Sequence, residues 1–137
     1  MFAKTKTFYG WYVAICCSVV YLFVNSMTLF VPQSIFPRLM EEFSINQAEV
    51  SLTVANTLFY ASFLSPLSGI LIDKYGVKIV IRIGVIIMAL IYSFYPFASS
   101  IDTLYRLHIL MAFGLVMSGL GPNVIIVSQW FKKHRGK

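Results

Sequence analysis

Residues 69–78 read GILIDKYGVK, and they place an aspartate, two lysines and two glycines at the end of a long apolar run. A second long run without charged residues begins a few positions later. A soluble amphipathic helix would spread such charges along one face. Here they are gathered in one short stretch, which is typical of a connection between two helices that lie in apolar surroundings.

The uncharged runs indicate which surroundings these are. Hydrophobic residues make up 58% of the chain and charged residues 12%, against about 25% charged residues in an average soluble domain. Asp, Glu, Lys and Arg are absent from residues 7–37, 50–72, 83–101 and 107–131. Each run meets or exceeds the roughly 17–25 residues that cross a bilayer as a helix. The chain is therefore predicted to be an all-α, polytopic helical membrane protein with one membrane domain over residues 1–137.

Local signals set the ends of the four membrane spans. The predicted spans are residues 11–36, 47–72, 79–97 and 105–130. Pro32 and Pro37 should bend or end the first span. Asn46 followed by Glu49 is the pattern of a helix capping box, which would start the second span at Gln47.

The basic residues predict how the chain is oriented. Lys and Arg accumulate on the cytoplasmic side of short loops. Arg38 and Arg106 lie beside one end of the spans. The other basic residues lie at the opposite ends: Lys4, Lys6, Lys74, Lys78, Arg82, Lys132, Lys133, Arg135 and Lys137. Both termini are thus predicted to face the cytoplasm from the plasma or inner membrane, and the net charge of +6 reflects orientation and not nucleic-acid binding.

Polar side chains inside three of the spans gather on single helix faces. Lipid offers such groups no partners, so spans one, two and four are expected to face the bundle interior. The third span, almost wholly apolar until its outer end, is expected to face lipid. The stripes fit either ordinary hydrogen bonds between helices or a polar central cavity. The candidate cavity residues are Asn25, Thr28, Asn56, Tyr60 and Asn123.

No cluster of His, Cys or acidic residues suits a metal site or a nucleophile with its base. An enzyme is therefore not expected, and neither a cofactor nor a metal is predicted. His108 is expected near the membrane interface and is interpreted as a polar residue without a special role.

The stretch at 69–78 resembles the signature loop of the major facilitator superfamily of secondary transporters, G-x-x-x-D-[RK]-x-G-x-[RK]-[RK]. The matching residues are Gly69, Asp73, Lys74, Gly76 and Lys78. Ile79 departs from the last basic position, and Arg82 follows three residues later. The resemblance implies a latch that holds two transporter halves together on the cytoplasmic side. Gly69 is expected to allow a close helix contact, and Gly76 a tight turn with positive φ.

A second stretch supports the same resemblance. Trp130-Phe131 followed by Arg135-Gly136 is similar to the W-F-x-x-x-R-G loop after the fourth span of many facilitators. The opening FYGWYVAICC and the later PRLMEEFSINQAEVS are similar to the oxalate/formate and monocarboxylate branch. Some monocarboxylate carriers have a lysine in the first span, and this chain has none there.

The resemblance implies secondary active transport of a small solute, such as an organic anion or monocarboxylate, by alternating access. This chain would be the N-terminal part, with further C-terminal spans as its partner, and alone it is not expected to transport. One alternative is a non-transporting membrane scaffold or a degenerate remnant. Another is a four-span small multidrug exporter, which would need a carboxylate inside the membrane that these spans lack.

Overall fold

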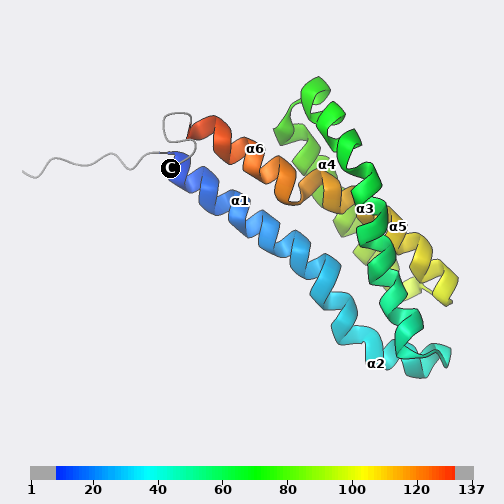
Figure 1. The fold of residues 1–137 in the computed structure, drawn as a ribbon. Coiled ribbons are helices and arrows are strands. Elements are labelled where there is room, and N and C mark those ends of the chain that lie inside the picture. Colours follow the sequence, from blue (N-terminus) through cyan, green and yellow to red (C-terminus); the bar gives the residue numbers. More distant parts are fainter. Residues whose placement is uncertain (1–8, 132–137) are drawn as a thin grey trace, which may run out of the picture.

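The computed structural model describes residues 9–131, and helices joined by short turns make up this part of the chain (Figure 1). The elements are α1 (Gly10–Asn25), the π-helical η1 (Ser26–Phe30), α2 (Val31–Phe43), α3 (Gln47–Tyr75), α4 (Val77–Phe94), the 3-10 helix η2 (Tyr95–Phe97), α5 (Ile101–Ser118) and α6 (Leu120–Trp130). By length and composition, four stretches can cross a membrane: Gly10–Phe43, Gln47–Tyr75, Val77–Phe97 and Ile101–Trp130. The predicted all-α, four-span fold is confirmed.

Several predicted boundaries agree with the structure. The second span begins at Gln47, and the third and fourth end at Phe97 and Trp130. The capping box is present, because the Glu49 amide donates to Asn46 Oδ1 at 2.9 Å and the Asn46 amide donates to Glu49 Oε2 at 2.9 Å. The third and fourth spans begin a few residues earlier than predicted.

The predicted end of the first span is wrong. Helical structure continues to Phe43, and Pro37 lies inside α2. Pro32 is the second residue of α2, two positions after the last residue of the π-helical segment η1. A proline lacks the N–H of a regular helix and its ring collides with the carbonyl four residues earlier, whereas a wider π turn shifts the hydrogen bonding by one residue. The helix therefore passes Pro32 and ends at Phe43, and Ser44 follows as its C-cap with φ 52°.

Helix α5 holds the central position. It packs most extensively against α3 and α4, whereas α1 lies along α6 (Figure 1). The two halves of the fourth span thus have different main neighbours. Helix α4 buries one face against the bundle and exposes apolar side chains such as Ile79, Ile83 and Leu90 on its others.

Two glycines set the distance between α4 and α5. A β-carbon on Gly84 would lie 2.8 Å from Met117 Cβ and 2.9 Å from the Ser118 amide nitrogen. One on Gly114 would lie 2.7 Å from Met88 Sδ. Small residues allow this close approach of helices in membranes. At Gly69, where such a contact was predicted, no described atom lies within 4 Å of an added β-carbon.

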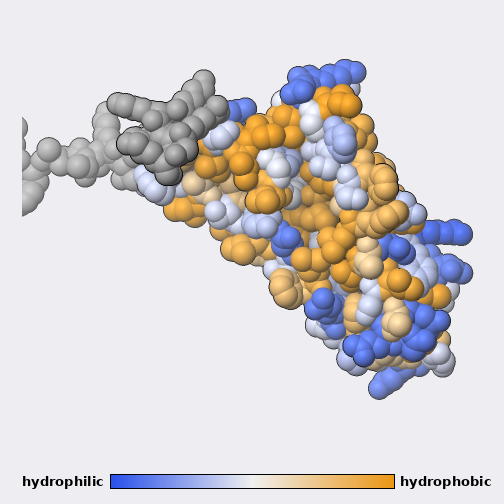
Figure 2. Space-filling model, viewed as in Figure 1, coloured by the Kyte–Doolittle hydropathy of each residue, from blue (hydrophilic) through white to orange (hydrophobic). Residues whose placement is uncertain are grey.

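The surface matches a lipid environment. Figure 2 shows hydrophobic residues over the middle of the visible face and hydrophilic residues gathered toward its ends. Large apolar side chains are widely exposed, among them Phe23 at 64%, Phe63 at 69% and Ile70 at 63%. Soluble proteins rarely expose apolar patches on this scale, so these faces are suited to contact with hydrocarbon or with other membrane helices.

We predict that Gly84→Ala destabilises the chain and that Gly69→Ala does not. The added methyl group on Gly84 meets α5 backbone, and such overpacking costs about 1–3 kcal/mol. At Gly69 the methyl group has free space, so the higher helix propensity of alanine makes the change neutral or slightly stabilising. Denaturation in mixed micelles, followed by circular dichroism, measures both. Equal stability of the two variants would contradict the close packing of α4 on α5.

Candidate functional site

The fourth span is interrupted at Gly119, between α5 and α6. Gly119 is extended, with φ −77° and ψ −152°, and its amide donates to the Leu115 carbonyl at 2.7 Å. A β-carbon at this position would lie 2.4 Å from that same carbonyl oxygen, so only glycine fits. Pro122 has no N–H to donate to the Ser118 carbonyl, as a continuous helix would require. The interruption therefore leaves main-chain acceptors without their usual partners inside a membrane span.

Asn123 supplies the missing donor. Its Nδ2 donates to the main-chain oxygens of Ser118 and Gly119, each at 2.7 Å. The side chain is 4% exposed, and its Oδ1 is buried without a partner among the described residues. Unsatisfied main-chain groups are costly in lipid, so this side chain stabilises the break. The sequence identified Asn123 as a cavity residue, but its hydrogen bonds go to the backbone.

A groove of about 540 Å³ lies between α1, α3 and the break, and we call it the serine groove. Asn25 of α1 lines it, and Asn25 Nδ2 donates to the Tyr21 carbonyl at 3.1 Å. The α3 wall carries Ser62, Ser65 and Ser68, and the break contributes residues 119–122. Sequence reasoning missed these serines, although their three-residue spacing puts them on one helix face.

The other predicted cavity residues lie elsewhere. Thr28 is fully buried and donates to the Val24 carbonyl of its own helix at 2.8 Å. Asn56 is half-buried and Tyr60 is 38% exposed, and neither lines the serine groove. Of the five predicted residues, the structure brings Asn25 to the groove and Asn123 to the break behind it.

His108, interpreted from the sequence as a polar residue without a special role, lies in a buried cluster of hydrogen bonds. His108 is fully buried in α5, with Nδ1 2.8 Å from Thr57 Oγ1 of α3 and Nε2 3.2 Å from the Tyr95 hydroxyl of η2. Thr57 Oγ1 also lies 3.1 Å from the His108 carbonyl oxygen. The imidazole therefore joins three elements through hydroxyl partners. The sequence held a signal for this burial, because Leu104 and Met111 are apolar and lie four positions before and three positions after His108, on the same helix face. Both are buried in the structure.

The turn between α3 and α4 has the predicted backbone. Gly76 has φ 85°, and its amide donates to the Ile72 carbonyl at 2.8 Å. Asp73, Lys74 and Lys78 are exposed around it, and Lys74 Nζ lies 5.2 Å from the Tyr75 ring. The latch contact assigned to Asp73 stays a prediction. Within the described part of the chain, no three His, Cys, Asp or Glu residues are grouped to hold a metal ion.

Four apolar spans, a glycine break in the last and a polar groove beside it define an integral multi-pass membrane protein. Residues 18–137 match the Major Facilitator Superfamily. The chain belongs to this superfamily, whose members are secondary transporters and not enzymes. The match argues against the four-span exporter, which has a different architecture.

The chain also resembles a characterised transporter. It is 26% identical over 136 residues to monocarboxylate transporter 7 from Homo sapiens. The alignment covers 93% of this chain and 24% of the human protein, so the chain spans a minor part of that relative's length. No solved structure matches the chain significantly.

We predict that Thr57→Val destabilises the bundle more than Thr53→Val. Both threonines are buried on α3, but among the described residues Thr53 Oγ1 donates a hydrogen bond only to the Val50 carbonyl of its own helix, at 2.6 Å. Valine at position 57 leaves a ring nitrogen of His108 without a partner, which costs about 1–3 kcal/mol. Denaturation in mixed micelles gives the difference. A larger loss for Thr53→Val would show that the imidazole is not held through Thr57.

Proposed function

We propose that this chain forms part of a transporter that carries a small organic anion, a monocarboxylate, along the serine groove by alternating access. Superfamily membership implies secondary transport. The finer assignment rests on the likeness to a monocarboxylate transporter. The observation that carries it is the serine groove itself, a groove with serine and asparagine side chains between two spans and the break of a third.

The groove offers suitable donors for a carboxylate. The α3 wall supplies the hydroxyls of Ser65 and Ser68, and the α1 wall supplies the second N–H of Asn25 Nδ2, whose first is donated to the Tyr21 carbonyl. Helix α6 begins at Leu120, beside the groove, and the free amides of a helix N-terminus favour anions. Broken membrane helices place such termini against anionic substrate groups in other transporter folds.

No lysine or arginine of the described residues lines the serine groove. Hydroxyl, amide and helix-terminal groups therefore provide what this chain contributes to anion binding. A full counter-charge would come from further spans that face the groove. This division fits alternating access, in which a midplane site lies between two sets of helices that move against each other.

We place the turn at Asp73–Lys78 on the cytoplasmic side, because the basic residues gather at that end of the spans. Asp73 is exposed there and free to accept hydrogen bonds from a second set of helices. A charge-assisted contact of this kind forms when the cytoplasmic side is closed and separates when it opens. Asp73 would thereby hold the outward-open state.

The proposal predicts that Asn25→Leu weakens transport and that Asn56→Leu does not. The substitutions are made in the complete transporter of which this chain is proposed to form part, and uptake of radiolabelled acetate, pyruvate and a neutral sugar is measured in membrane vesicles. We expect saturable uptake of the monocarboxylates, with KM raised about tenfold by Asn25→Leu through loss of a hydrogen bond to a charged group. Asn56 provides a matched control, since it lies on α3 outside the groove.

Two outcomes would contradict the proposal. Uptake that does not saturate for either monocarboxylate would remove the assigned substrate class. An Asn25→Leu variant with unchanged KM would show that the solute does not pass this face of α1.

A further inference from the structure

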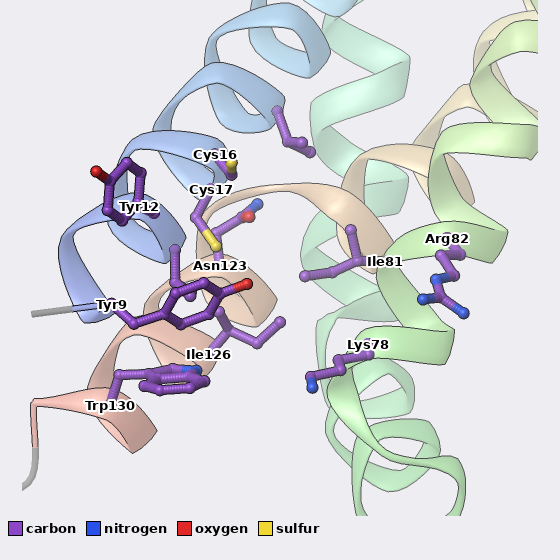
Figure 3. A pocket seen from close by; sticks show the side chains of 12 residues that line it. Tyr9, Tyr12, Cys16, Cys17, Lys78, Ile81, Arg82, Asn123, Ile126 and Trp130 are labelled. Carbon is purple, nitrogen blue, oxygen red and sulfur yellow. The ribbon is translucent and has the colours of Figure 1, made fainter.

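A second cavity, of about 390 Å³, lies between α1, α4 and α6 (Figure 3). We call it the basic cavity. It shares no lining residue with the serine groove. It lies at the end of the bundle where α4 and α1 begin and α6 ends, so it sits at the level of one bilayer interface.

Two cations line the basic cavity. Lys78 and Arg82 lie one turn apart on α4, and both are exposed. No acidic residue is among the lining residues, and within residues 9–131 neither cation forms an ion pair. Arg82 is in the second turn of α4, about 7–8 Å along the helix from its start at the rise of an α-helix. An unpaired cation at that depth in a membrane calls for an anion.

The opposite wall of the basic cavity is aromatic at the end of the bundle and apolar further in. The rings of Tyr9 and Trp130 have centroids 5.2 Å apart, and Figure 3 shows them across from the α4 cations. Aromatic side chains of this kind favour the headgroup region. Cys17, Ile81 and Ile126 supply apolar lining. The cavity is therefore amphipathic, with charge and aromatic rings near the interface and an apolar floor toward the membrane centre.

Asn123 leaves one buried acceptor at the inner end of the basic cavity. Its side chain lines this cavity (Figure 3), and its buried Oδ1 has no partner among the described residues. Buried acceptors are almost always satisfied by protein or ordered water. An ordered water at this position would supply the donor.

We propose that the basic cavity binds an anionic phospholipid, with its phosphate between Lys78 and Arg82 and an acyl chain along the apolar floor. Basic pockets between membrane helices at the interface bind lipid headgroups by this combination of charges and apolar surface. A lipid phosphate is always present at this level of the bilayer, whereas a free anion would have to enter from water. The site is separate from the proposed solute path.

The 137-residue chain, reconstituted in vesicles, tests the assignment through Trp130, which lines the cavity. Trp11→Phe leaves Trp130 as the sole tryptophan. Its fluorescence is quenched by phosphatidylglycerol with brominated acyl chains, or by brominated phosphatidylcholine, in otherwise identical phosphatidylcholine vesicles. We expect stronger quenching by the anionic lipid, with its relative binding constant reduced about fivefold for each cation removed by Lys78→Gln and Arg82→Gln.

A matched control removes two positive charges from outside the basic cavity. The Lys74→Gln, Arg106→Gln variant changes two cations that do not line the cavity, and it should keep the preference. Arg82→Lys keeps the charge and should also keep it, which separates charge loss from misfolding. Equal loss in the control would overturn the site in favour of a general charge effect.

A competition measurement distinguishes a lipid phosphate from free inorganic phosphate as the occupant of the cavity. Excess inorganic phosphate in the buffer should leave the preference for brominated phosphatidylglycerol intact, after correction for ionic strength with chloride. Displacement by phosphate beyond the chloride effect would overturn the lipid assignment. Since the readout is lipid contact, its failure is distinguishable from failure of the transport proposal.

Discussion

The requirement that polar groups inside a bilayer find partners within the protein controls this structure. The fourth span shows it most directly. Gly119 interrupts the helix, Pro122 removes a donor, and the side chain of Asn123 replaces that donor with two hydrogen bonds of 2.7 Å. Without this replacement, the Ser118 carbonyl would have no hydrogen-bond donor in an apolar region. The broken helix is stable because one amide side chain is positioned to repair it.

The same requirement explains how the remaining spans are joined. His108 satisfies both ring nitrogens with hydroxyls from α3 and η2, and Gly84 and Gly114 bring α4 against α5. Helices α3, α4 and α5 are therefore connected by both hydrogen bonds and close packing. Helix α1 instead lies along α6, and the serine groove lies where these two sets of helices meet.

Much of the fold could be predicted from sequence, because span length and capping are local properties. The uncharged runs gave the four spans, and Asn46 with Glu49 gave the start of α3. The first span was predicted to end before Pro37, but the helix continues through this residue. Whether a helix continues past a proline depends on the structure around it. Gly76 was read correctly because its positive φ serves a local turn.

The site was harder to predict, because it depends on which helices become neighbours. Asn25 lines the serine groove. Thr28 does not, because its hydroxyl donates to the Val24 carbonyl and the side chain is fully buried in the bundle. The partner of His108 is Thr57, more than fifty positions away in the chain, and no local pattern joins them. The α3 serines were overlooked because their role depends on α1 and the Gly119 break lying opposite.

Cysteine accessibility in intact cells tests the central claim, a bundle of four spans with its charged turn in the cytoplasm. In a background of Cys16→Ala and Cys17→Ala, single cysteines are introduced by Tyr75→Cys and, at the opposite end of the bundle, by Ser99→Cys. A membrane-impermeant maleimide should label the cysteine at 99 from outside, and the one at 75 only after the membrane is opened. Ready labelling at 75 in intact cells would contradict the account.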